Sequence, residues 1–155
     1  MSAPELLERL AGRWSGTSTL VLPSLAPPGS ISDSTATIGP VARGKFARIE
    51  YTWAHEGSPH EGVLLVGREQ KSDLAEVVWI DSWHQSEKFL LCEGRLDPSG
   101  AIDVVGHYPA PPGPDWGWRT AIRATPGGWE LVMHNISPEG EETLAFRNVY
   151  ERERA

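Results

Sequence analysis

Along most of the chain, apolar and polar residues alternate, which is the pattern of a strand that buries one face. The alternation runs over ten segments, at about residues 13–22, 31–39, 44–55, 61–69, 75–83, 88–96, 101–109, 117–124, 128–137 and 142–152. Turn-forming residues separate the segments, as in Asp97-Pro98-Ser99-Gly100 and Pro138-Glu139-Gly140. The pattern therefore predicts about ten short strands that follow one another as hairpins.

One segment at the start of the chain has a helical period instead. Leu6, Leu7 and Leu10 fall on one helical face, and Gly12 is placed to end the helix. The preceding Ser2-Ala3-Pro4-Glu5 fits a capping box with a proline in the first turn. The sequence predicts one short helix, over about residues 4–11.

Ten strands in hairpin order make a sheet too long to remain open, and closing it into a barrel removes both edges. A chain of 155 residues has the size of one domain, and the sequence contains neither an internal repeat nor a linker. We therefore predict an all-β fold, an antiparallel barrel of about ten strands in a single domain over residues 1–155. Segments 13–22 and 142–152 are expected to pair and close the barrel, and the helix is expected to plug one end.

The alternation also predicts which side chains face the barrel interior. Glu76 belongs in water, so Trp79, Asp81 and Trp83, on the opposite face of the same strand, belong inside. Trp14 and Trp129 are assigned to the core. The remaining inward set combines an apolar wall with a few polar groups, which is typical of a small-molecule site. The candidate ligand-binding residues are Tyr51, Trp53, Trp79, Asp81, Trp83, Tyr108, Trp118, Thr120, Met133 and Asn148.

Asp81 is the carboxylate of this predicted interior, and its burial is costly unless donors satisfy it. Candidate donors are the indoles of Trp53, Trp79 and Trp83 and the hydroxyls of Tyr51 and Thr120. In a second interpretation, Asp81 ties its own hairpin by accepting backbone N–H bonds near Ser82 and His84. In a third, Asp81 is the general base of an enzyme, which requires a raised pKa. The sequence leaves the three interpretations open.

Charge and composition narrow the choice of partners. The net charge of −7 argues against nucleic-acid binding, because phosphate contacts need clustered lysine and arginine. Cys92 is the single cysteine, so neither an internal disulfide nor a CxxC motif is present. The N-terminal residues lack the apolar stretch of a secretory signal, and no segment is long enough to span a membrane. We expect a cytoplasmic protein with no nucleic-acid or membrane partner and no cofactor.

The proline-rich segments 23–29 and 109–115 are expected to form stiff loops, because proline fixes φ and removes a backbone donor. Such loops, or an edge of the barrel, would support a homodimer, since two-fold dimers are the commonest oligomers.

Histidines give weaker signals. His55 and His60 flank a turn, where a metal site competes with the commoner explanation of a solvated hairpin. His107 and His134 fall on the outer face, so haem binding inside the barrel by either one requires an error in the strand register.

Gly12-Arg13-Trp14, directly after the predicted helix, resembles the Gly-x-Trp signature of calycins, which are the lipocalins, the fatty-acid-binding proteins and related barrels. This resemblance implies that an arginine near the last strand packs over Trp14, and Arg152 is placed to do so.

From Leu10 onward, the chain also resembles a bacterial family of unknown function with a lipocalin-like barrel. The matching pieces, in order, are Glu61-Gly62, Gly67, Trp79-Ile80-Asp81-Ser82, Gly94, Asp97, Gly100, Gly106, Trp118-Arg119, Gly140-Glu141 and Tyr150-Glu151-Arg152. The resemblance implies a barrel with a ligand cavity and no established activity.

Binding of a small, partly apolar ligand inside the barrel is therefore the predicted function. A structural or oligomerisation module with a filled barrel is the second hypothesis. A barrel enzyme that uses Asp81 as general base and a haem-binding barrel are the other two.

Overall fold

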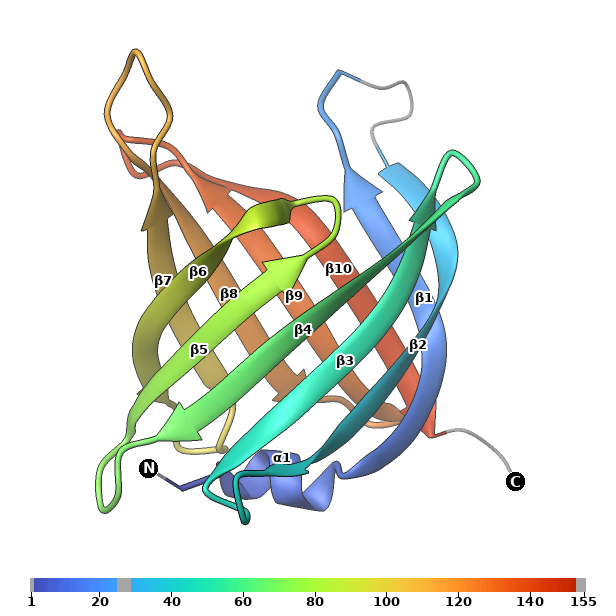
Figure 1. The fold of residues 1–155 in the computed structure, drawn as a ribbon, viewed down its shortest axis with the longest axis vertical. Helices are drawn as coiled ribbons and strands as arrows, with labels where there is room; N and C mark the ends of the chain where they lie inside the picture. The colour runs from blue at the N-terminus through green and yellow to red at the C-terminus, as the bar shows by residue number, and fades with distance from the viewer. Residues whose placement is uncertain (1, 25–28, 153–155) are drawn as a thin grey trace.

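The alternating segments form ten strands that close into one antiparallel barrel (Figure 1). The computed structural model describes residues 2–24 and 29–152. Each strand pairs with its neighbours in sequence, and the first pairs with the last, so the predicted fold class is confirmed. The strands are β1 (Gly12–Val21), β2 (Gly29–Val41), β3 (Phe46–His55), β4 (Ser58–Arg68), β5 (Leu74–Asp81), β6 (Gln85–Leu96), β7 (Ile102–Tyr108), β8 (Trp116–Ala124), β9 (Gly128–Ile136) and β10 (Glu142–Arg152).

Pairing between β1 and β10 closes the barrel. Their register runs from Trp14 opposite Arg152 to Leu20 opposite Phe146, which confirms the pairing predicted for these two segments. At Gly16 the two backbones approach so closely that a Cβ would collide with the carbonyl oxygen of Val149. Closure therefore depends on a residue without a side chain at this position.

The helix α1 (Glu5–Arg9) lies across one end of the barrel, at the bottom of Figure 1, and buries Leu6 and Leu7. The predicted capping box is wrong. The N-cap residue is Pro4, and no side chain caps the helix. Ser2 instead exchanges backbone hydrogen bonds of 2.9 and 2.8 Å with Arg68 at the end of β4, so its backbone continues the sheet rather than capping the helix. Among the described residues, no helix is long and apolar enough to cross a membrane.

Trp14 and Arg152 complete the closure of the helix end. The guanidinium carbon of Arg152 lies 4.2 Å from the Trp14 ring, as predicted, and Arg152 also donates a hydrogen bond to the carbonyl of Ala11. The Trp14 indole donates to the carbonyl of Leu10, which ties the strand to the turn after the helix. Such a cation–π contact contributes about 0.5–2 kcal/mol.

The opposite end of the barrel, which we call the open end, carries no helix among the described residues. The connections between β3 and β4, β5 and β6, β7 and β8, and β9 and β10 lie there (Figure 1). The second proline-rich segment, 109–115, is the β7–β8 connection. Residues 25–28 of the first lie outside the described part of the chain. The candidate site is at this end.

Candidate functional site

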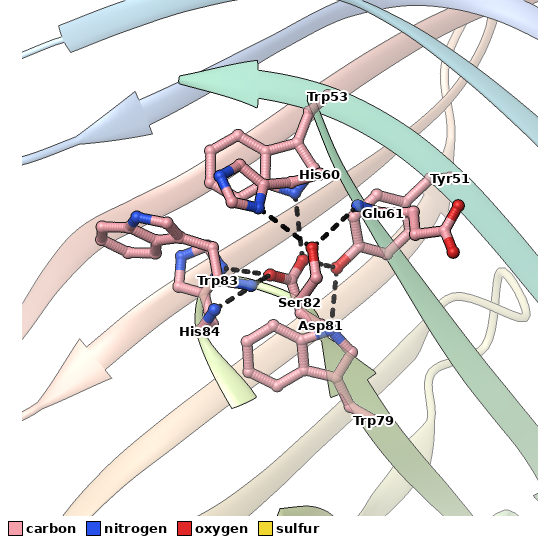
Figure 2. Close-up of polar contacts among 9 residues, drawn as sticks. All are labelled: Tyr51, Trp53, His60, Glu61, Trp79, Asp81, Ser82, Trp83 and His84. Carbon is pink, nitrogen blue, oxygen red and sulfur yellow. Dashed lines mark hydrogen bonds and ion pairs between the residues drawn. The ribbon is translucent and has the colours of Figure 1, made fainter. Parts of the chain in front are cut away.

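Asp81 is the last residue of β5, and its side chain points into the barrel, where the residue is 2% exposed. Its Oδ2 accepts hydrogen bonds from Tyr51 Oη at 2.6 Å and from Trp53 Nε1 at 3.1 Å (Figure 2). Its Oδ1 accepts the backbone N–H groups of Trp83 and His84 at 2.8 and 2.9 Å. Each oxygen thus has two donors, which satisfies the buried carboxylate.

Asp81 therefore accepts hydrogen bonds from neighbouring side chains and also ties its own hairpin, so the first two interpretations hold together. One oxygen ties the β5–β6 turn, and the other holds two aromatic side chains of β3. The Trp79 indole reaches the network one step away, because it donates to Tyr51 Oη at 2.8 Å. Thr120, one of the candidate donors, is not among the donors to Asp81.

The charge state of Asp81 follows from these contacts. Burial by itself raises the pKa of the carboxyl group, but the nearby His84 and the Tyr51 hydrogen bond outweigh it, so the pKa lies below its ordinary value. The pKa of Tyr51 is raised well above its usual range by burial and by the Asp81 charge. A general base needs a carboxyl group with a raised pKa, so Asp81 is poorly suited to that role.

A bulge in β6 and a glycine on β4 allow the network to form at the end of β5. Between Trp79 and Asp81 the register with β6 shifts, from Trp79 opposite Leu90 to Asp81 opposite Gln85, so β6 bulges. Ser82 then turns outward, where its hydroxyl contacts His60 Nδ1 at 3.0 Å and accepts the N–H of Glu61 (Figure 2). On the adjacent strand β4, Gly62 is paired with Tyr51 and leaves room for it, because a Cβ there would collide with the Tyr51 ring.

The predicted position of Trp83 is wrong. The strand ends at Asp81 rather than continuing to residue 83, so Trp83 lies in the turn and is 38% exposed. Its ring packs edge-on against Trp53 at the rim, with 5.8 Å between the ring centroids. A period of two cannot be extended through a turn, and the sequence Asp-Ser-Trp-His gave no proline or glycine to mark where the strand stops.

Sequence reasoning missed the histidine at the centre of the site, His84. Its imidazole is surrounded by Trp53, Trp79, Trp83, Trp118 and Phe146, with ring-centroid distances of 4.7–5.7 Å. The ring's Nδ1 lies 3.2 Å from Asp81 Oδ1, but the contact is not aligned as a hydrogen bond. The available signal was its position three residues after the buried carboxylate, within reach of a turn tied by Asp81.

The aromatic rings around His84 form a layer across the barrel interior. Trp79 on β5 stacks on Trp118 of β8, with 5.2 Å between centroids. Phe146 of β10 packs against Tyr51 and Trp53 of β3, with 5.9 and 5.0 Å between the ring centroids. Of the predicted site residues, the structure therefore brings Tyr51, Trp53, Trp79, Asp81 and Trp118 together, with Trp83 packed against them from the turn.

The other predicted residues lie on the inner face of β7 to β10. Thr120 pairs with Met133 across β8 and β9, and both are fully buried. Tyr108, at the end of β7, is half-buried and donates a hydrogen bond to Asn135. Asn148 donates to Tyr150, which shares a hydrogen bond with Ser34. These residues border the aromatic layer but do not contact Asp81 through hydrogen bonds.

Three polar atoms of the predicted site residues on this wall are buried without a hydrogen-bond partner among the described residues. They are Trp118 Nε1, Thr120 Oγ1 and Asn148 Oδ1. Buried polar atoms are nearly always paired in native proteins, because each unpaired one costs about 1–3 kcal/mol. The three atoms include one donor, one acceptor and one hydroxyl that can act as either.

Comparison with known families gives one match. A family model described as a protein of unknown function (DUF1579) matches residues 2–152. The chain belongs to the DUF1579 family. No curated protein matches the sequence. The predicted membership of a family of unknown function is thus confirmed, and the wider calycin relationship remains a prediction.

The remaining histidines considered as haem ligands lie outside the interior of this DUF1579 barrel, and its cysteine is unreactive. His107 is exposed on the outer face, and His134 is half-buried there. Among the described residues, no three histidine, cysteine or carboxylate side chains are grouped to hold a metal ion. Cys92 is buried, and burial raises its thiol pKa to about 12, so it is a poor nucleophile.

A groove of about 400 Å³ lies on the outer wall of the DUF1579 barrel, beside the β6 bulge. Its lining includes Val63, Ile80 and the largely exposed Phe89. The groove shares only Asp81 with the predicted ligand-binding residues. It is a separate surface from the aromatic layer around His84.

Proposed function

We propose that this DUF1579 barrel binds a small, partly apolar molecule at its open end. The observation that carries the proposal is the set of three unpaired polar atoms, Trp118 Nε1, Thr120 Oγ1 and Asn148 Oδ1, on one wall of the interior. A guest that supplies an acceptor and a donor to these atoms would remove the cost of leaving them unpaired. No protein atom of the described residues pairs with these three atoms.

The composition of the surrounding wall supports a partly apolar guest. Trp79, Trp118, Met133 and Phe146 present flat or flexible apolar surfaces beside the unpaired atoms, which is the usual make-up of a small-molecule site. The helix α1 closes the opposite end, so a guest would enter from the open end (Figure 1). The Gly12-Arg13-Trp14 signature and the Arg152 contact support placing this binding site in a barrel of calycin type.

The proposal includes a cytoplasmic location and no catalytic role. A buried, unpaired Cys92 suits a reducing compartment. The lowered pKa of Asp81 favours structure over base catalysis. The competing hypothesis is a module whose barrel is filled by its own side chains, and the close packing of the rings around His84 is the observation that favours it.

The test is a fluorescence titration with Nile red, a neutral apolar dye. We expect saturable binding by the wild-type chain and a loss of affinity of about tenfold in Trp118→Phe, which removes the indole N–H and part of the stacking surface. The matched control is Trp129→Phe. Trp129 is also buried, also has an unpaired Nε1 among the described residues, and lies at the helix end against Trp14.

If the two variants lose affinity equally, the effect is on stability and the site is not at the open end. If the wild-type chain shows no saturable binding, the filled-barrel hypothesis replaces the proposal.

A further inference from the structure

His84 occupies an aromatic cage. Four indoles and one phenyl ring surround its imidazole, with ring-centroid distances of 5.4 Å to Trp53, 5.4 Å to Trp79, 4.7 Å to Trp83, 5.7 Å to Trp118 and 5.0 Å to Phe146. The rings come from β3, β5, β8, β10 and the β5–β6 turn, so all sides of the barrel contribute. Cages of this kind attract cations, because the face of each ring carries negative charge.

A carboxylate forms one side of the same cage. Asp81 Oδ1 lies 3.2 Å from the His84 ring, and four hydrogen-bond donors keep the carboxylate in place. A buried carboxylate next to aromatic faces is complementary to a positive charge with an apolar surface.

The connections at the open end carry negative charge, as Asp81 does. In the sequence of the connections at this end, the acidic residues are Glu56, Asp115, Glu139 and Glu141, and lysine and arginine are absent. Lys88, on β6, lines the outer groove beside Asp81. An acidic rim raises the local concentration of cations and speeds their approach.

We propose that the cage of Trp53, Trp79, Trp83, Trp118 and Phe146 is a receptor site for a small organic cation, of the trimethylammonium or imidazolium class, which enters by displacing the His84 ring. The inference rests on the proposed function and specifies its ligand. His84 occupies the cage as an internal substitute for this guest: an imidazole held by aromatic faces beside a carboxylate.

The His84 ring is placed to leave. Its residue belongs to the β5–β6 turn at the open end, its side chain is 9% exposed, and its Nδ1 makes no aligned hydrogen bond. The backbone N–H of His84, by contrast, is fixed by Asp81. A rotation about the side-chain bonds therefore empties the cage without unfolding the turn.

The decisive experiment compares choline with the neutral alcohol in which a carbon atom replaces the choline nitrogen. In His84→Gly, where the cage is vacated, calorimetry should show choline binding at least about tenfold tighter than the neutral alcohol. Adding Asp81→Asn should reduce this preference to less than about threefold. Equal affinities for choline and the alcohol in His84→Gly would overturn the proposal.

The wild-type chain provides a second measurement that does not depend on a cage variant folding. The five neighbouring rings are expected to shift the ring-proton NMR signals of His84. Choline should move them toward the positions of exposed His107, and the neutral alcohol should not. Unchanged His84 signals at saturating choline would overturn displacement.

The outcomes separate the two proposals. If Nile red binds and is sensitive to Trp118→Phe while choline and the alcohol do not differ, the cation site is wrong and the binding function stands. If neither dye nor choline binds, both are wrong.

Discussion

At the scale of single residues, Asp81 holds the open end together by bonding to two strands and one turn at once. Its partners Tyr51 and Trp53 belong to β3, and the N–H groups that it accepts belong to the β5–β6 turn. Replacing the carboxylate by an amide places a donor where Oδ2 accepts two hydrogen bonds. The site therefore depends on the negative charge as well as on the shape of this side chain.

We expect Asp81→Asn to lower the free energy of unfolding by about 1–3 kcal/mol near neutral pH. The pKa of Asp81 is lowered in the folded chain, so its stabilisation is complete above the unfolded value of about 3.9 and is lost as the pH falls through the lower folded pKa. Urea titrations should show that the difference in free energy of unfolding between wild type and variant narrows below about pH 4. Asp33→Asn, on the exposed outer face of β2, is the control and should change little. A gap that stays constant down to acid unfolding would contradict the assignment.

Replacing Thr120 tests whether one of the unpaired polar atoms contributes to stability. Thr120→Val removes a hydroxyl that has no partner among the described residues and keeps the side-chain shape. We expect the free energy of unfolding to stay the same or to rise by up to about 1–3 kcal/mol. Ser34→Ala, which loses the hydrogen bond to Tyr150, should instead lower it by about 1 kcal/mol. Chemical denaturation decides, and a loss in Thr120→Val as large as in Ser34→Ala would show a structural role.

What the sequence could predict at this scale was orientation rather than contact. The charge of Glu76 placed Asp81 inside, and parity placed Tyr51, Trp53 and Trp79 beside it. Parity says nothing about residues after the last strand position, so Trp83 was misplaced and His84 was missed. Their positions depend on how Asp81 folds the turn.

At the scale of elements, strands β1 and β10 decide whether the sheet is a barrel. Ten strands in hairpin order made the closure predictable, and the calycin resemblance implied the Trp14–Arg152 contact that accompanies it. The bulge in β6 and the bridge between Ser2 and Arg68 were not predictable, because both depend on the register between strands rather than on a local pattern.

Gly16→Ala should disrupt this closure, because the new Cβ meets the backbone of Val149, which cannot move without breaking the pairing. We expect a loss of about 3 kcal/mol or more in the free energy of unfolding. Gly39→Ala on β2, where nothing lies within 4 Å of the new Cβ, is the matched control and should cost little. Thermal unfolding followed by circular dichroism measures both, and equal stability of the two variants would contradict the closure account.

At the scale of the whole molecule, the barrel separates its two ends. The helix end is closed by α1 (Figure 1) and by the Trp14–Arg152 contact, and the open end holds the aromatic side chains around His84. Closure also removes one predicted route to a homodimer, because a closed sheet has no edge to share. Dimerisation through the loops remains a prediction. Light scattering that gives only the 17.0 kDa monomer at high concentration would contradict it.

Whether the barrel holds a ligand is tested by a native mass spectrum of the wild-type chain, recorded on freshly purified protein and again after incubation with excess Nile red. We predict one small molecule per 17.0 kDa chain, either retained from purification or supplied as dye, that is lost on denaturation. A bare polypeptide mass under both conditions, or a ladder of dye adducts without a one-to-one complex, would contradict a binding site inside the barrel.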